Sequence, residues 1–245
     1  MPILEGRGVT KHFGGLAAVS RVDFHVDQGE VTGLIGPNGA GKTTLFNLIS
    51  GAVVPDSGVI RFKGTDITGS KPHHICRMGI ARTFQSVKVF GNLSVLENVL
   101  LASMFGKSTG ISSASAKKEA GELLEFVGLK AAAAVQAKEL TLVSQKRLEV
   151  ARALATRPQL LLLDEMMAGL NHTEVAQAMD LVARIRDKGI TILMIEHVMK
   201  AIMNVCGRIM VLHHGEKIAE GTPDEIATSR TVIEVYLGEQ VYAGS

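Results

Sequence analysis

The stretch Gly36-Pro37-Asn38-Gly39-Ala40-Gly41-Lys42-Thr43 decides the fold of this chain. It fits the pattern G-x-x-x-x-G-K-[ST], follows the apolar run Val31 to Ile35, and opens a helical run from Thr44 to Ser50. The glycines let the backbone curl so that N–H groups point at phosphate oxygens, and the following helix adds its positive end. Lys42 brings a compact charge to the outer phosphates, and the Thr43 hydroxyl is a natural Mg²⁺ ligand. The sequence therefore predicts a phosphate-binding loop with a bound nucleotide and Mg²⁺.

A second element of the same site is predicted at Leu160 to Leu163, which is closed by Asp164 and Glu165. Four consecutive apolar residues suit a strand that is buried on both faces of a parallel sheet. In phosphate-loop proteins the Asp at the end of such a strand holds the metal, and a Glu beside it can take a proton from an attacking water. Without the phosphate loop, two solvated carboxylates at a strand end would be the simpler interpretation. With it, we expect Asp164 to bind Mg²⁺ and Glu165 to be catalytic.

Short apolar runs alternate with segments of helical period along the rest of the chain, which indicates an α/β fold. Further buried strands are predicted at 190–195 and 208–212, with a crossover helix from Glu174 to Lys188 before them. The alternating stretches Ala18 to Val26 and Val59 to Lys63 are typical of antiparallel strands with one wetter face.

The middle of the chain, from Leu93 to Ala155, has an almost entirely helical pattern. Within it we expect helices at Lys117 to Val127 and Gln145 to Ala155. The Ser/Gly/Ala-rich stretch from Ser103 to Ala116 is interpreted as a loop. These patterns predict a helical subdomain.

Length and composition limit the class of protein. A chain of 245 residues with 46% hydrophobic residues suits one domain with subdomains. The 26 basic and 24 acidic residues give a net charge of +2 without long runs of one sign, so nucleic acid is not expected as a partner. Two cysteines, Cys76 and Cys206, form no disulfide framework or metal motif, which favours the cytoplasm. No stretch approaches the ~18 apolar residues of a membrane helix, so work on a membrane would require other proteins' spans.

With the wording GPNGAGKTTL at 36–45, the chain resembles the ATP-binding subunits of ABC transporters over nearly its whole length. The resemblance implies a P-loop NTPase fold, with a RecA-like core, an antiparallel β subdomain and an inserted helical subdomain. It implies one ABC ATPase domain over 1–245, in which approximately 1–90 and 156–245 form the nucleotide-binding core and 91–155 the helical signature subdomain. It also implies ATP and Mg²⁺ as cofactors, with ATP held between two ATPase subunits.

The resemblance assigns roles to further residues, one motif at a time. Phe13 stands where the family stacks an aromatic ring on adenine. Gln85 matches the glutamine that reaches the metal and the attacking water, and His197 matches the histidine aimed at the γ-phosphate. Ala168 to Asn171 is similar to the loop that crosses to the partner subunit. The expected catalytic residues are thus Lys42, Gln85, Glu165 and His197; the metal ligands are Thr43, Gln85 and Asp164; and the ATP-binding residues are Phe13, Gly36, Pro37, Asn38, Gly39, Ala40, Gly41, Lys42, Thr43, Thr44, Gln85 and Asp164.

The signature motif of the family, L-S-G-G-Q, is matched imperfectly by Leu140 to Ser144. Thr141 keeps the hydroxyl, but Val143 replaces the glycine that lets backbone approach the γ-phosphate of the opposite subunit, and Ser144 replaces the glutamine. Two interpretations are open. Either the site that this signature completes is weakened, which we prefer, or the valine is tolerated because Thr141 and the helix N-terminus still reach the phosphate.

Four stretches narrow the resemblance to the ATPases of high-affinity branched-chain amino-acid uptake: 79–85, 92–99, 196–199 and 235–239. Such transporters commonly pair two different ATPase subunits, although a homodimer remains open. The implied partners are the second ATPase, integral-membrane permease subunits and, indirectly, an extracytoplasmic solute-binding protein. The implied location is the cytoplasmic face of the inner (plasma) membrane, with residues 85–98 as the dock for a permease helix.

Other functions within the same family remain as alternatives. These are an ATPase of urea or amide uptake, an ATPase of lipid or lipopolysaccharide export, and a partly degenerate subunit of a heteromeric ATPase pair. A soluble ABC ATPase of DNA repair or translation would need a long coiled coil or a tandem duplication, which 245 residues do not contain. A regulatory subunit that binds ATP without hydrolysis is disfavoured by Gln85 and His197 and kept open by Val143.

Overall fold

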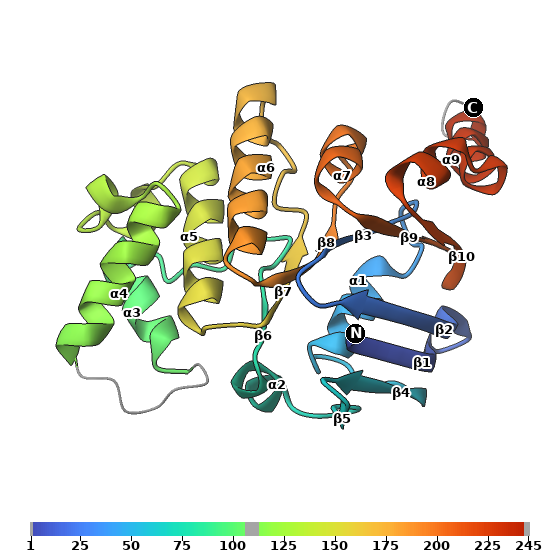
Figure 1. The fold of residues 1–245 in the computed structure, drawn as a ribbon, viewed down its shortest axis with the longest axis horizontal. Coiled ribbons are helices and arrows are strands. Elements are labelled where there is room, and N and C mark those ends of the chain that lie inside the picture. The colour runs from blue at the N-terminus through green and yellow to red at the C-terminus, as the bar shows by residue number, and fades with distance from the viewer. Residues whose placement is uncertain (1, 106–112, 243–245) are drawn as a thin grey trace.

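The computed structural model describes residues 2–105 and 113–242 of the chain as an alternation of strands and helices (Figure 1). The strands are β1 (Pro2–Phe13), β2 (Leu16–Asp27), β3 (Val31–Ile35), β4 (Ser57–Phe62), β5 (Thr65–Asp66), β6 (Ile80–Arg82), β7 (Leu160–Asp164), β8 (Thr191–Ile195), β9 (Arg208–His213) and β10 (Glu216–Gly221). The helices are α1 (Lys42–Ile49), α2 (Pro72–Met78), α3 (Val95–Ser103), α4 (Ser113–Phe126), α5 (Leu142–Ala155), α6 (His172–Asp187), α7 (Met199–Val205), α8 (Pro223–Thr228) and α9 (Arg230–Tyr242). Two 3₁₀ turns, η1 (Lys130–Ala132) and η2 (Ala137–Glu139), precede α5.

A six-stranded sheet in the order β10-β9-β3-β8-β7-β6 carries the phosphate loop. All its neighbouring strands pair in parallel except β10, which runs antiparallel to β9 at one edge. The carboxyl ends of parallel strands meet at one edge of a sheet, where ligands bind in open α/β folds. Here that edge brings together the segments that follow β3, β7 and β8, so the predicted phosphate, metal and histidine motifs converge as expected.

The buried strands divide their side chains between two hydrophobic cores, as a two-sided sheet requires. In β7, Leu161 and Leu163 belong to one core and Leu160 and Leu162 to the other, and all four are fully buried. Helices α6 and α7 cover one face of the sheet, whereas α1 lies against the opposite face (Figure 1). The prediction of a strand buried on both faces is therefore confirmed.

A four-stranded antiparallel sheet, in the order β2-β1-β4-β5, forms the second layer. Its core side chains, among them Val9, Phe24 and Phe62, share one hydrophobic cluster with Leu45 and Phe46 of α1. The two predicted antiparallel strands are confirmed as parts of β2 and β4. Since β1 and β2 form one long hairpin, Phe13 at its tip is carried toward the phosphate loop.

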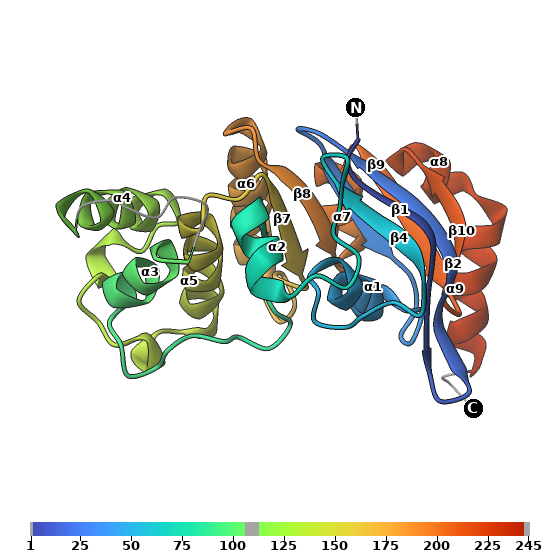
Figure 2. The ribbon, with the colours of Figure 1, turned by 90° about the horizontal axis from the view of Figure 1, so that it is seen from below.

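Helices α3, α4 and α5 gather at the end of the molecule opposite to the antiparallel sheet (Figures 1 and 2). The two helices expected here are confirmed in α4 and α5, although α5 starts three residues earlier, at Leu142. The loop predicted for Ser103 to Ala116 is wrong at both ends, because Ser103 ends α3 and Ser113 to Ala116 open α4, where alanine favours the helix. Residues 106–112 of that prediction lie outside the described residues. Across the described part of the chain, no helix has the length and apolarity needed to cross a membrane.

Candidate active site

The phosphate loop joins β3 to α1 and is built on glycines that no other residue could replace without distortion. Gly36 and Gly41 have φ angles of 149° and 100°. A Cβ atom on Gly36 would lie 2.0 Å from the Leu212 carbonyl oxygen, and one on Gly41 would lie 2.2 Å from the Ala18 carbonyl oxygen. The glycine spacing therefore reflects both left-handed backbone angles and close approach of neighbouring backbone.

Lys42 is the first residue of α1 and lies back across its own loop. Its side chain is buried, and Nζ donates hydrogen bonds to the carbonyl oxygens of Gly36 at 2.6 Å and Pro37 at 2.8 Å. Helix α1 has Gly41 as its N-cap, without a side-chain capping bond or an acidic residue in the first turn. A buried ammonium group and the positive end of an uncapped helix favour an anion at this point.

A cavity of about 400 Å³ lies over the loop. Eleven of the predicted site residues line it: Phe13, Asn38, Gly39, Ala40, Gly41, Lys42, Thr43, Thr44, Gln85, Glu165 and His197. The Phe13 side chain is 51% exposed, which leaves its ring available for stacking. The other three predicted residues, Gly36, Pro37 and Asp164, are buried and do not line the cavity.

Glu165 is held by two of the residues that sequence reasoning grouped with it. Gln85 Nε2 donates to Glu165 Oε2 at 2.9 Å, and His197 Nε2 lies 2.8 Å from Glu165 Oε1. Glu165 itself has a φ angle of +50°, in the left-handed region that costs a non-glycine residue on the order of 1 kcal/mol or more. The three side chains come from different segments of the chain, yet they converge on one carboxylate beside the phosphate loop.

Asp164 is 1% exposed and is paired with Arg82, a residue that sequence reasoning gave no role in the site. Arg82 Nη2 donates to Asp164 Oδ2 at 2.8 Å, while Asp164 Oδ1 has no hydrogen-bond partner among the described residues. Burial raises the pKa of Asp164, and the hydrogen bond and charge of Arg82 act in the opposite direction. The Nη1 atom of Arg82 donates to Asn47 Oδ1 at 2.7 Å, which anchors the carboxylate to α1.

His214 is a second residue that sequence reasoning missed. It stands on the turn between β9 and β10 with a φ angle of 46°, and it lines the cavity over the phosphate loop. The turn is fixed to that loop, because Gly215 N donates to the Ala40 carbonyl oxygen at 3.1 Å. A histidine about 170 residues after the loop gives no local signal in the sequence, since only the strand order brings it there.

The signature segment begins α5. Thr141 is the N-cap, and its Oγ1 accepts a hydrogen bond from Ser144 N at 3.3 Å. Val143 is half-buried and lines a narrow gap with Met166 and Leu170 of the same chain. Leu142, in the position of the first glycine of L-S-G-G-Q, is 50% exposed and is a departure that sequence reasoning passed over.

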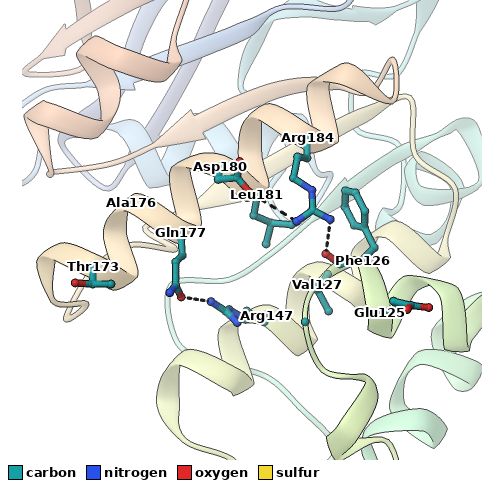
Figure 3. Close-up of a pocket in the computed structure, with 11 residues that line it drawn as sticks. Glu125, Phe126, Val127, Arg147, Thr173, Ala176, Gln177, Asp180, Leu181 and Arg184 are labelled. Atoms are coloured by element: carbon teal, nitrogen blue, oxygen red, sulfur yellow. Dashed lines mark hydrogen bonds and ion pairs between the residues drawn. The ribbon is translucent and has the colours of Figure 1, made fainter.

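Two further hollows lie away from the phosphate loop. One, of about 720 Å³, includes Phe84, Lys88 and Phe90 in its lining. The other, of about 470 Å³, lies between α6, the end of α4 and the second turn of α5, with Arg147 and Arg184 in its lining (Figure 3). Neither is lined by a residue of the predicted ATP site.

Comparison with known proteins gives the family. The sequence model of the protein family described as ABC transporter matches residues 19–168. The family model described as branched-chain amino acid ATP-binding cassette transporter matches residues 216–242. The high-affinity branched-chain amino acid transport ATP-binding protein BraF of Pseudomonas aeruginosa is 41% identical, with 97% of this chain and 98% of BraF covered. LivG of Escherichia coli, which carries the same description, is 40% identical over the same shares.

Solved structures agree. The ADP conformation of MJ1267, an ATP-binding cassette of an ABC transporter, superposes with a TM-score of 0.88 at 32% identity and covers 97% of this chain and 99% of its own. A dimeric cassette, MJ0796 bound to ADP and phosphate, gives 0.81 at 26% identity, with 90% and 98% covered.

The chain belongs to the ABC transporter family as an ATP-binding subunit that couples ATP hydrolysis to transport. Within that family it groups with the ATP-binding proteins of branched-chain amino acid transport. The predicted fold, a P-loop α/β core with an antiparallel subdomain and helical insertion, is confirmed by the same likeness.

Proposed function

We propose that this chain hydrolyses Mg-ATP at its own phosphate loop to power uptake of branched-chain or related amino acids. The observation that carries the catalytic part is the convergence of Gln85 and His197 on the Glu165 carboxylate, at 2.9 and 2.8 Å, beside the loop. In that arrangement Glu165 orients or deprotonates the attacking water, and His197 and Lys42 stabilise the charge that develops on the γ-phosphate.

Mg²⁺ fits the donors present. Asp164 Oδ1 is buried without a hydrogen-bond partner among the described residues, and Thr43 lines the cavity over the phosphate loop. Nor do those residues contain a cluster of three His, Cys, Asp or Glu side chains, so the remaining ligands would be phosphate oxygens and water, as Mg²⁺ commonly uses. Gln85, Thr43 and Asp164 are the protein ligands we assign. When bound, the ion would supply positive charge that offsets the charge of the phosphates.

Phe13 is assigned to the adenine ring and the loop backbone from Gly36 to Thr44 to the phosphates. The half-exposed Phe13 ring and the buried Lys42 ammonium form part of one cavity of about 400 Å³, within the usual size of a small-ligand site. This arrangement supports ATP lying along the cavity from the β1–β2 hairpin to α1.

A second ATPase subunit is proposed to complete the site, because the phosphate cavity is open on the side of this chain's Gln85 and His197 side chains, both of which are exposed. The partner is more consistent with a different chain than with a second copy, since Leu142 and Val143 replace both glycines of the signature. We prefer a weakened site at this signature over a tolerated valine, which would depend on Thr141 at the start of α5 still reaching the phosphate.

The permease is proposed to dock in the hollow that includes Phe84, Lys88 and Phe90. The Phe84 and Phe90 side chains are 41% and 48% exposed, and α5 fixes the segment between them: Lys88 N donates to Glu149 Oε1 at 2.7 Å. The dock borders both the core and the proposed helical signature subdomain, 91–155, so closure of the ATP site would move the permease. Such a subunit works at the cytoplasmic face of the inner membrane, with the solute captured by an extracytoplasmic binding protein.

Turnover of the purified chain tests the proposal, first alone and then mixed with its candidate partner ATPase and permease subunits. We expect hydrolysis that appears or rises strongly on mixing. Equal turnover of the chain alone would contradict the heteromeric arrangement, and no turnover in any mixture would contradict the assignment of hydrolysis to this chain.

A further inference from the structure

The short segment between β7 and α6 fixes the direction of the Glu165 carboxylate, and two buried side chains hold that segment from opposite sides. One is Glu196, the last residue before His197, which is 2% exposed. The other is Lys146 on α5, which is 9% exposed. Neither residue belongs to a motif that the sequence analysis used for chemistry, and neither lines the ATP cavity.

The Glu196 carboxylate accepts a hydrogen bond from a backbone N–H of this segment. Met167 N donates to Glu196 Oε1 at 2.7 Å, while Glu196 Oε2 has no hydrogen-bond partner within the described part of the chain. Glu196 is also joined in sequence to His197, which contacts Glu165 Oε1. One buried acid thus links the histidine segment to the backbone two residues after Glu165.

The Lys146 ammonium group donates hydrogen bonds to backbone carbonyl oxygens of the same segment. Its Nζ donates to the Ala168 carbonyl oxygen and, at 3.4 Å, to the Glu165 carbonyl oxygen. The ammonium group comes from the second turn of the helix that begins with the signature residues. The signature helix therefore touches the backbone of the catalytic carboxylate residue directly.

These contacts matter because the conformation of Glu165 is not self-sustaining. Its φ angle of +50° is costly for a residue with a Cβ and persists only where surrounding contacts impose it. Glu165 N donates to the Ile195 carbonyl oxygen at 2.9 Å, which fixes the residue at its start. Lys146 binds the Glu165 and Ala168 carbonyl oxygens and Glu196 binds Met167 N, so the segment is also held after Glu165.

From this arrangement we infer that Glu196 and Lys146 are positioning residues for hydrolysis, which hold the Glu165 to Ala168 backbone so that the Glu165 carboxylate meets Gln85 and His197. The inference rests on the proposed function, in which Glu165 acts on the attacking water. It adds a direct mechanical link from the signature helix to that carboxylate within a single subunit.

The pKa values of Glu196 and Lys146 are both shifted by burial. Burial raises the pKa of Glu196 to about 7, against the lowering effects of the Met167 N–H and of Lys146. Burial likewise lowers the pKa of Lys146, while the charges of Glu196, Glu149 and Glu165 raise it. Burying two ionisable groups costs free energy. Here both buried groups form hydrogen bonds to the backbone of one segment, which fits a role in holding that segment.

The test uses the assembled transporter, with this chain, its partner ATPase and the permease subunits, and compares kcat with ATP affinity. Glu196→Met removes the acceptor of the Met167 N–H, and Lys146→Met removes the donor to both carbonyls at nearly constant length. We expect kcat to fall roughly 10-fold to 100-fold in each, since small misplacements of a catalytic group cost that much, with ATP affinity changed less than about 3-fold. Glu196→Gln keeps an Oε1 acceptor and is expected to restore most of the turnover.

Two matched controls separate positioning from a general loss of packing. Thr191→Val removes a buried acceptor, for Gly29 N at 3.0 Å, at the opposite end of the same strand β8. Arg147→Met removes the neighbouring contact of α5 with Gln177 of α6 (Figure 3). Both are expected to keep kcat near that of the unaltered protein, whatever they do to thermal stability.

The double variant Glu165→Gln with Lys146→Met decides whether the effect acts through Glu165. If it does, Lys146→Met lowers single-turnover hydrolysis no further in the Glu165→Gln background. A further drop in the double variant by the whole factor that Lys146→Met alone causes would overturn the inference. A kcat within about 3-fold of normal in folded Lys146→Met would overturn it as well. If Glu196→Met does not fold, Lys146→Met alone decides the matter. Unaltered turnover in Glu165→Gln would instead overturn the proposed function, so the two failures are distinguishable.

Discussion

Replacing Arg82 by Met should destabilise the chain strongly, because it would leave the buried Asp164 carboxylate without its ion-pair partner. The Arg82 and Asp164 side chains are 8% and 1% exposed, and they are joined by a 2.8 Å ion pair. Arg82 also donates to Asn47 at 2.7 Å and to Ser50 at 3.1 Å. Methionine replaces the aliphatic part of the arginine side chain but makes none of these hydrogen bonds.

The magnitude follows from the cost of leaving one member of a buried ion pair alone, about 3 to 5 kcal/mol. For a chain of this size 1 kcal/mol corresponds to roughly 2 to 4 °C in the melting temperature, so the fall should be about 6 to 20 °C. The structure adds a direction for the pKa of Asp164, which burial already raises and which loses the opposing effect of Arg82 in the variant.

Thermal unfolding of the purified chain, followed by circular dichroism, measures the effect. Lys130→Met is the matched control, since it removes an exposed ion pair with Glu125, 68% and 63% exposed, that should contribute less than about 1 kcal/mol. A melting temperature for Arg82→Met as close to the unaltered chain as that of the control would refute the reasoning, because Asp164 would then not depend on Arg82.

Three other expectations concern single residues. Burial raises the pKa of Glu196 in the folded chain from 4.5 to about 7, so its protonated form adds stability below about pH 4.5. This stability, about 3 kcal/mol in all, is lost as the pH rises to 7. Glu196→Gln should flatten this part of the profile of unfolding free energy against pH, and an unchanged profile would contradict the burial argument. His214→Ala should weaken ATP binding measurably by equilibrium titration. His213→Ala, at the end of β9 and outside the cavity lining, should not, and equal effects of the two would remove His214 from the site. Val143→Gly should raise the turnover of the assembled transporter, and turnover that does not rise would favour a tolerated valine.

Much of the fold could be predicted because its signals are local. The apolar run ending in Asp164 and the glycine-rich turn at Gly36 to Thr43 each specify a strand and the segment after it, and the sheet places both at one edge as expected. The start of α4 could not be placed, since Ser113 to Ala116 belong to a Ser/Gly/Ala-rich stretch whose composition is compatible with either loop or helix.

The missed parts of the site depend on contacts between distant segments. Arg82 meets Asp164 only because β6 pairs with β7, and His214 reaches the phosphate loop only because β9 pairs with β3. Glu196 lies in the stretch 196–199 that carries the family resemblance, but its burial and its hydrogen bond from Met167 N depend on the packing of distant segments. No periodicity or spacing in one sequence encodes such pairings, whereas Gln85 and His197 could be assigned through the resemblance.

The central claim is that Glu165 of this chain activates water for ATP hydrolysis, and Glu165→Gln tests it most directly. Turnover of the assembled transporter and binding of a fluorescent ATP analogue would be measured on the same preparation. The account predicts that the turnover due to this chain's site falls by orders of magnitude, on the scale of about 10²-fold or more expected for loss of a general base, while binding is retained. Turnover equal to that of the unaltered transporter would contradict it.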